Sequence, residues 1–253
     1  MLLRAMEANL AEHASHLHRH LPDMTVDEPG DLVVADSGLT DDTFNIISYA
    51  RFAPADADRR IASTVDALAR TGRPYSWWVG PASTPADLSA RLSSAGLSVS
   101  EREPAMVAEL RDVERAAATV VSDAAGLAAF AAVVAANWDP SAPTVLEFFT
   151  RATPWALAPD CPSRYLLRYE DGVPVAAAEV CFAAGVAGIY NVCTLTAWRE
   201  RGHATHLMRA AMSLARENGF DRAVLQASED GARVYARLGF EPVGDFVEHR
   251  LGG

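Results

Sequence analysis

The densest set of residues with chemical potential in this chain of 253 residues lies at positions 198–207, Trp-Arg-Glu-Arg-Gly-His-Ala-Thr-His-Leu. Three arginines lie in this segment or beside it: Arg199, Arg201 and Arg209. The segment contains one acidic residue, Glu200. This local excess of basic residues contrasts with the net charge of the whole chain, which is -11. The small residues Gly202 and Ala204 allow a ligand to approach the backbone closely. These residue types in this order indicate a site for an anion such as phosphate.

The elements expected around this segment place it at the start of a helix. Residues 189–195 are β-like, and a helical pattern of apolar residues begins at Ala204 and ends at Gly219. The first turn of a helix has amide hydrogens without partners inside the helix, and the helix dipole adds partial positive charge there. A phosphate group at this turn would therefore meet backbone amides as well as basic side chains.

The hydrophobic pattern of the whole chain predicts an α/β (α+β) fold. Helices are expected at residues 1–21, 57–70, 84–95, 123–137, 144–151, 204–218 and 230–238. Strands are expected at residues 31–36, 44–51, 75–79, 164–169, 173–182, 186–195, 223–226 and 240–250. Asp171-Gly172 predicts a hairpin turn. The charged segment 101–104, which ends in proline, predicts a domain boundary, and residues 106–110 could either close the first domain or begin the second.

Composition limits the classes of function. Half of the residues are hydrophobic and 22% are charged, as in a globular protein with a sizeable core. A pI near 5.0 argues against binding of nucleic acid. The three cysteines are odd in number and form no C-x-x-C pair, which indicates a reducing compartment. Since no apolar run has secretory or transmembrane character, we expect a cytoplasmic protein without a membrane partner.

Histidines raise the alternative of a metal site. Four of them lie near the N-terminus: His13, His16, His18 and His20. Their spacings of three, two and two do not place all four on one helix face. His203 and His206 lie at i, i+3 without a nearby third ligand in the sequence, so we predict no metal at either place.

Two motifs in the second half resemble those of the GCN5-related N-acetyltransferase (GNAT) family, over about residues 118–250. Residues 199–204, Arg-Glu-Arg-Gly-His-Ala, resemble the family's acyl-CoA pyrophosphate loop, and residues 235–240, Tyr-Ala-Arg-Leu-Gly-Phe, resemble its Tyr-x-x-x-Gly-Phe ending. Each pattern is weak alone; about thirty residues apart and in the expected context, they are strong together. The resemblance implies the GNAT fold, a mixed and mostly antiparallel sheet flanked by helices.

The resemblance also implies roles for individual residues toward acetyl-CoA as co-substrate. The residues implied to bind it are Cys193, Thr194 and Leu195 along the pantetheine arm, Arg199, Arg201, Gly202, His203, Ala204, Thr205 and His206 at the pyrophosphate, and Ser228, where many relatives carry Asn. Tyr235 would act as the general acid. An amine that attacks a thioester builds charge first on an oxyanion and then on sulfur, which amides and a phenol can stabilise in turn.

Alternatives remain open for the acid and the base. Tyr235 lies three residues before Leu238 on a short expected helix, a spacing that a core tyrosine also has. The attacking amine must lose a proton, and Glu179, in an apolar run that could raise its pKa, is the first candidate base. Glu147 and a chain of water molecules are the others, and Glu179 could instead be a strand-edge glutamate.

The first half repeats the element order of the second, which predicts a partial, degenerate GNAT-like domain at residues 1–104 before a GNAT acetyltransferase domain at residues 105–253. Residues 53–58 contain two acids and no Arg-x-x-Gly-x-Ala, and Leu92 stands where the second half has tyrosine. We therefore expect one active site, in the second half.

The function predicted is transfer of an acetyl group from acetyl-CoA to a primary amine of a small molecule or peptide. A non-catalytic acyl-CoA-binding or structural module on the same fold is the alternative. A homodimer is one possible oligomeric state. The sequence does not identify the amine that accepts the acetyl group.

Overall fold

The computed structural model describes residues 1–251, which divide into two compact units. Unit 1 is Met1–Ala105 together with the C-terminal segment from Pro242, and unit 2 is Met106–Glu241. A division at residues 104/105, as predicted, assigns the C-terminal segment to the second domain. In the structure this segment belongs to unit 1, because its strand pairs there with an earlier strand.

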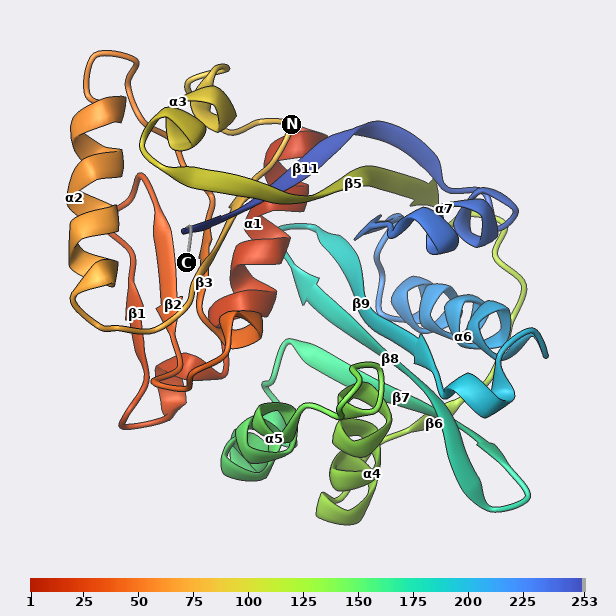
Figure 1. Ribbon diagram of the computed structural model, residues 1–253. Helices are drawn as coiled ribbons and strands as arrows, with labels where there is room; N and C mark the ends of the chain where they lie inside the picture. Colours follow the sequence, from red (N-terminus) through yellow and green to blue (C-terminus); the bar gives the residue numbers. More distant parts are fainter. Residues whose placement is uncertain (252–253) are drawn as a thin grey trace. The chain divides into compact units, whose positions relative to one another are not determined.

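Unit 1 contains a sheet flanked by helices (Figure 1). Its helices are α1 (Leu2–Ser15), η1 (His18–His20), η2 (Asp42–Phe44), α2 (Ala57–Ala69) and α3 (Leu88–Ser94). Its strands are β1 (Thr25–Asp27), β2 (Val33–Asp36), β3 (Ile46–Ser48), β4 (Ser76–Val79), β11 (Glu241–Leu251) and the first part of β5 (Leu97–Glu109), in the order β1-β2-β3-β4-β11-β5. The β3–β4 pair is parallel, and the pairs β1–β2, β2–β3 and β4–β11 are antiparallel.

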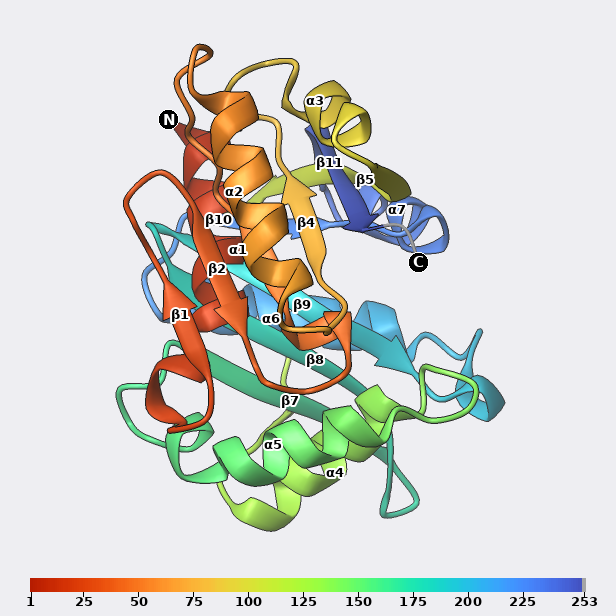
Figure 2. The ribbon, with the colours of Figure 1, turned by 60° about the vertical axis from the view of Figure 1, so that its left-hand side comes forward.

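The core of unit 1 lies between its sheet and helices α2 and α3. Ile61 of α2 and Leu88 and Leu92 of α3 share one cluster of buried residues with Trp77 of β4. The Trp77 indole is completely buried and meets the Phe52 ring edge-on, at 6.4 Å between centroids. Figure 2 shows α2 on one side of the strands and α1 on the other.

Unit 2 carries the segment with the predicted site. Its helices are α4 (Ala124–Ala135), α5 (Pro143–Ala156), η3 (Thr196–Trp198), α6 (His203–Glu217) and α7 (Glu229–Ala236). Its strands are the end of β5, β10 (Arg222–Gln226), β9 (Val186–Thr194), β8 (Val173–Ala183), β7 (Ser163–Glu170) and β6 (Thr119–Val120), in the order β5-β10-β9-β8-β7-β6. The β9–β10 pair is parallel, and β6–β7, β7–β8 and β8–β9 are antiparallel. The mixed, mostly antiparallel architecture predicted from the sequence is confirmed.

Helices cover both faces of the unit 2 sheet (Figure 1). Successive strand residues face opposite sides, so β7 and β8 contribute to two layers. Leu166 and Val180 join a cluster with Leu207 of α6. Tyr165, on the other face, packs against Phe130 of α4 with ring centroids 4.9 Å apart.

Several local signals act as expected. Asp123 caps α4 by accepting a hydrogen bond from the Gly126 N–H at 2.7 Å. Asp171 and Gly172 both have positive φ, at 49° and 79°, as a tight hairpin between β7 and β8 requires. Gly219, at φ 86°, follows the end of α6.

Two expectations about the bounds of helices are wrong. α3 begins at Leu88 rather than at Thr84, because the Thr84 hydroxyl donates to the Phe52 carbonyl and does not cap the helix. The helix expected at residues 144–151 extends from Pro143 to Ala156. Residues 101–104 lie directly before the place where unit 1 ends and unit 2 begins, Ala105/Met106, and the strand β5 runs through this place.

Candidate functional site

Gly202 marks the start of α6 and leaves the first helical amides open. Its φ of 80° lies in the left-handed region, and an added Cβ there would meet nothing within 4 Å. No side chain caps α6, so the N–H groups of His203, Ala204 and Thr205 have no partner within the helix. The His206 N–H donates to the Gly202 carbonyl at 3.0 Å, so the amide of His206 is not available as predicted.

Arginines around this turn have different partners. The Arg199 Nε donates to the Thr194 carbonyl at 3.2 Å, which ties the turn to the end of β9. The Arg201 guanidinium lies 4.8 Å from the centre of the Trp198 ring and donates to the Ala197 carbonyl. Arg201 is exposed, so it keeps a cation at the mouth of the turn.

A cavity of about 350 Å³ opens against the turn. It is lined by Arg168, Glu170, Trp198, Arg201, Gly202, His203 and His206. His203 is buried, and its Nε2 has no hydrogen-bond partner. The Nε of Arg168 is also buried without a partner. The His206 Nε2 donates to the Ala117 carbonyl at 2.8 Å. Basic groups therefore outnumber the one acid, as an anion site requires.

The end of β9 is open on the side away from β8. The β9–β10 register pairs are Ala187↔Ala223 and Gly188↔Val224, and β9 continues to Thr194. The Leu195 N–H donates to the Val175 carbonyl, and the Leu195 carbonyl accepts from the Trp198 N–H. Because hydrogen-bonding direction alternates along a strand, the backbone of Thr194 faces the open side.

Two of the three predicted contacts along β9 are therefore corrected. The backbone of Leu195 is used within the chain, and the same alternation turns the backbone of Cys193 toward β8. The Cys193 thiol approaches the Val133 carbonyl, and burial raises its pKa to about 12. Cys193 is thus a neutral thiol at physiological pH and not a nucleophile.

Two polar side-chain atoms near the ends of β9 and β10 are buried without a partner. They are Thr194 Oγ1 and Gln226 Nε2. Both follow the point where the two parallel strands stop pairing. An extended ligand with amide groups would supply hydrogen bonds there, as a peptide strand does at a sheet edge. The residues present therefore suit an elongated ligand that has anionic groups at the α6 turn and amide groups along the end of β9.

Tyr235 lies in α7, half-buried, with its ring 6.1 Å from the Phe240 ring. Ser228 directly precedes α7, and its hydroxyl oxygen accepts from the Gly231 N–H at 3.2 Å. Ser228 is therefore a helix cap, and its hydroxyl hydrogen can still donate to a ligand.

Glu179 is buried in β8, with only 2% of its surface exposed. Its Oε1 accepts from the Ser163 hydroxyl at 2.6 Å, and its Oε2 accepts from Asn191 Nδ2 at 2.9 Å. Burial, with the Glu179 charge as the next cause, raises the pKa of Tyr165 well above its usual value. Glu147, the other candidate base, is exposed in α5, and one of its carboxylate oxygens lies 3.8 Å from Arg151.

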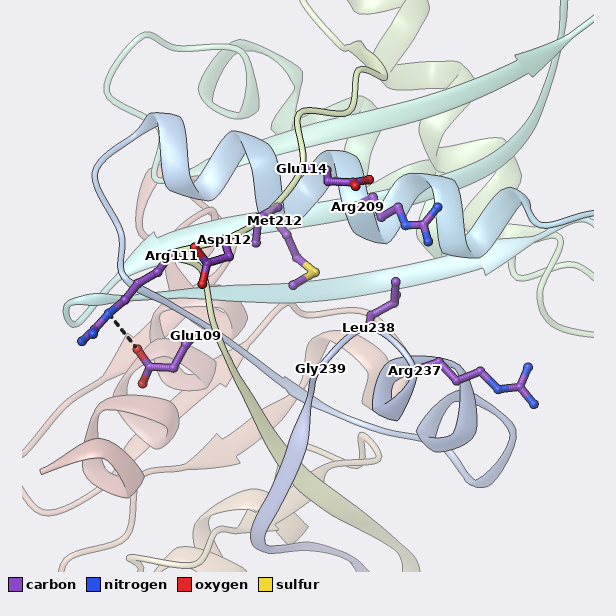
Figure 3. A pocket seen from close by; sticks show the side chains of 10 residues that line it. Glu109, Arg111, Asp112, Glu114, Arg209, Met212, Arg237, Leu238 and Gly239 are labelled. Carbon is purple, nitrogen blue, oxygen red and sulfur yellow. Dashed lines mark ion pairs between the residues drawn. The ribbon is translucent and has the colours of Figure 1, made fainter.

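A second cavity, of about 610 Å³, lies between α6 and the end of α7 (Figure 3). Arg209 and Arg237 point out on the same side of it, and Met212 and Leu238 lie between the two helices. Arg209 therefore lines this cavity and not the turn that precedes α6. The acids at its other end include Glu109, which pairs with Arg222 at 2.7 Å.

The N-terminal histidines have structural contacts. His16 Nδ1 bonds to the carbonyls of Glu12 and His13, and His18 Nε2 donates to the Phe44 carbonyl at 2.8 Å. Within residues 1–251, no group of three potential ligands has the arrangement of a metal site. Over the same residues, no helix has the length and apolar character needed to cross a membrane.

Three residues of the candidate site were not predicted from the sequence: Asn191, Gln226 and Arg168. Asn191 interrupts a β-like run, and asparagine is depleted in strands, so its presence could have indicated a bulge. Gln226 and Arg168 had no local signal, because pairing of strands brings them to the site.

Comparisons with known proteins give a family for part of the chain. Residues 131–240 match the family model described as Acetyltransferase (GNAT) family. No curated protein matches the chain.

Several solved structures share the fold over nearly the whole chain. A GCN5-related N-acetyltransferase from Kribbella flavida is 24% identical with a TM-score of 0.74, covering 98% of this chain and 96% of that one. A putative GNAT acetyltransferase from Novosphingobium aromaticivorans is 16% identical with a TM-score of 0.61, covering 98% of both chains. A GCN5-related N-acetyltransferase from Sphaerobacter thermophilus is 17% identical with a TM-score of 0.59, covering 98% of this chain and 90% of that one. At these identities the likeness concerns the fold.

The family model matches the segment that contains the α6 turn, the open end of β9 and Tyr235. Residues 131–240 of this chain are a domain of the acetyltransferase (GNAT) family.

Proposed function

We propose that this protein is an N-acetyltransferase that moves an acetyl group from acetyl-CoA to a primary amine of a small molecule or peptide. The observation that carries the proposal is the uncapped start of α6 beside the open end of β9, inside a GNAT-family domain. An anion-binding turn that continues into an open strand edge suits a ligand with phosphates at one end and an amide-rich arm at the other.

The proposed roles follow the contacts of each group. The amides of His203, Ala204 and Thr205, with the Arg201 cation, would hold the pyrophosphate. The Thr194 backbone and Gln226 would bind the pantetheine arm. The thioester brings an activated acetyl carbon to the end of the groove, where the amine nitrogen bonds to it as the carbon–sulfur bond breaks. Tyr235 would give its phenolic proton to the departing sulfur.

Water that reaches the groove would remove the proton from the attacking amine. The paired, buried carboxylate of Glu179 and the exposed position of Glu147 favour neither as a direct base.

Unit 1 is proposed to be a diverged copy of the same arrangement. It repeats a parallel strand pair joined by a helix, β3-α2-β4, which corresponds to β9-α6-β10 in unit 2. Beside its parallel pair, Glu7 of α1 accepts hydrogen bonds from Arg51, Ser83 and the Ala82 N–H. A carboxylate at this place would repel phosphate, so we propose one active site for the chain, in unit 2.

The catalytic proposal is tested by release of free thiol from acetyl-CoA, screened over polyamines, amino acids, aminoglycosides and peptide N-termini. Turnover with at least one amine is expected. Tight CoA binding by titration without thiol release for any amine would support the alternative, a non-catalytic acyl-CoA-binding module.

The turn is tested by a matched pair of glycine substitutions. Gly202→Glu is expected to weaken CoA binding about 100-fold or more, because it adds bulk and negative charge at the phosphates. Gly172→Glu is the control: this hairpin glycine has φ 79°, and its Cβ position is equally open. The two substitutions therefore meet the same φ strain and the same open space. Equal CoA affinity in both would contradict the assignment of the turn.

A further inference from the structure

A bulge in β9 separates its paired part from its open end. Ala177 pairs with Cys193 and Glu179 pairs with Tyr190, so the single residue between Ala177 and Glu179 faces two residues of β9. One of these two, Asn191, has a φ of 53°. An extra residue in the left-handed region bends a strand and increases its local twist.

Glu179 holds this bulge through the side chain of Asn191. The Asn191 Nδ2 donates to Glu179 Oε2 at 2.9 Å, while the Ser163 hydroxyl holds Oε1 at 2.6 Å. A left-handed residue other than glycine costs about 1–2 kcal/mol, and the hydrogen bond from Asn191 to Glu179 offsets much of this cost. The same two donors compensate for the burial of the carboxylate. The three side chains therefore form one unit that spans β7, β8 and β9.

The bulge lies at the point where the groove begins. The last β9–β10 pair is Gly188↔Val224, and Thr194, with its open backbone, follows the bulge. A bulge bends its strand, so the residues of β9 that follow Asn191 do not continue the line of the part that pairs with β10. The direction of the proposed acyl-donor groove thus depends on the conformation of Asn191.

We propose that Glu179 is a positioning residue, which through Asn191 fixes the β9 bulge that opens the acyl-donor groove, and is not the base that deprotonates the amine. The inference rests on the proposed function for its kinetic meaning. A base must come within hydrogen-bond reach of the proton that it removes. Glu179 is 2% exposed, and both of its oxygens already accept hydrogen bonds.

The test compares Glu179→Gln, Glu179→Ala, Asn191→Ala and a control, Glu217→Gln, at an exposed carboxylate of α6. The carboxamide of Glu179→Gln can accept from Ser163 and donate to Asn191 Oδ1 after the Asn191 amide rotates. It therefore keeps the bulge but removes a base. Asn191→Ala keeps the carboxylate but removes the contact. For each variant, kcat and KM are measured across pH 6–9, with melting temperature as a check of folding.

We expect Glu179→Gln to retain kcat within about three-fold and to keep the shape of the pH profile, because no essential base is lost. Asn191→Ala should lower kcat about 10- to 100-fold at a near-normal melting temperature, because a misplacement of about 1 Å costs up to about 100-fold. The kcat of Glu179→Ala should be as low as that of Asn191→Ala or lower. A fall of about 100-fold or more in Glu179→Gln, with loss of the acidic limb, would assign Glu179 as the base and overturn the proposal.

A second readout does not depend on turnover. Amide hydrogen exchange over residues 189–194 should be faster in Asn191→Ala than in the wild type and the control, since the bulge loses its side-chain contact. If the wild type shows no turnover with any amine, the proposed function fails and this measurement still decides the role of Glu179 and Asn191. Unchanged exchange in Asn191→Ala would refute it.

Discussion

Tyr235 occupies its place because of the residue one helical turn before it. An added Cβ at Gly231 would lie 2.8 Å from Cε2 of the Tyr235 ring, so glycine leaves room for the ring beside α7. On its other side the ring packs at an angle of 57° to the Phe240 ring. These contacts hold a half-buried ring, an arrangement that suits a group that packs at one edge and meets a substrate at the other.

Tyr235→Phe is expected to lower kcat about 100-fold while CoA affinity stays within about two-fold, because the ring contacts persist and only the proton donor is lost. Thiol release and CoA titration measure the two quantities. Tyr169→Phe, at a half-buried tyrosine of β7, is the control and should behave as the wild type. Unchanged turnover in Tyr235→Phe would leave the tyrosine with a packing role.

At the scale of elements, β5 shows how a charged segment can belong to a sheet. Residues 101–104 have the composition of a linker, yet they lie inside a strand that takes part in both units. Ser100 of β5 donates to Glu248 of β11 at 2.5 Å, and Arg102 lies 3.5 Å from Asp245. Contacts with a strand far along the sequence therefore outweigh the local signals for a break.

Glu103 in β5 should make unit 1 sensitive to pH. Burial raises its pKa from 4.5 to about 7, and the charges of Glu101 and Glu248 add to the shift. Because the folded state binds the Glu103 proton more tightly than the unfolded state, protonation of Glu103 contributes to stability. This contribution is fully present below pH 4.5 and is lost as the pH rises through 7.

Glu103→Gln should therefore raise the melting temperature at pH 8 by about 2–4 °C, the shift expected for about 1 kcal/mol. At pH 4.5 the variant and the wild type should melt together. Glu217→Gln, at an exposed carboxylate, controls for the lost charge. A uniform shift at both pH values would rule out a raised pKa as the cause.

At the scale of the whole molecule, the C-terminal strand completes unit 1. β11 pairs antiparallel with β4, from Val247↔Val79 to Arg250↔Ser76. Phe246 and His249 of β11 are completely buried. The chain thus returns to unit 1 after it has formed unit 2, and the predicted division at residues 104/105 separates β4 from its partner strand.

A fragment of residues 1–104 is therefore expected not to unfold cooperatively in urea, because β4 would have an unpaired edge and the core would lack Phe246. The same fragment followed by a flexible linker and residues 241–251 should recover a cooperative transition, followed by circular dichroism. The linked fragment with Phe246→Asp is the matched control and should not recover. Cooperative unfolding of residues 1–104 alone would contradict the role of β11.

Much of the fold and part of the site could be predicted from the sequence. Apolar periodicity located α2, α4 and α6 to within about two residues, and turn residues such as Asp171-Gly172 located the hairpin of β7 and β8. These signals are local: the same few residues that carry the signal adopt the structure. The start of α3 was misplaced because the Thr84 hydroxyl bonds to Phe52, a partner that the local pattern does not contain.

The sequence by itself determined the turn at the start of α6, since a left-handed glycine followed by an uncapped helix start is a property of consecutive residues around Gly202. Only the tertiary structure decided the position of β11, the side of β9 that stays unpaired and the partners of Glu179. Each of these depends on the register between strands that are distant in sequence, and one residue of register, such as the bulge at Asn191, changes which groups face each other. Local residue types do not specify that register, because it is the combined packing of both strands that selects it.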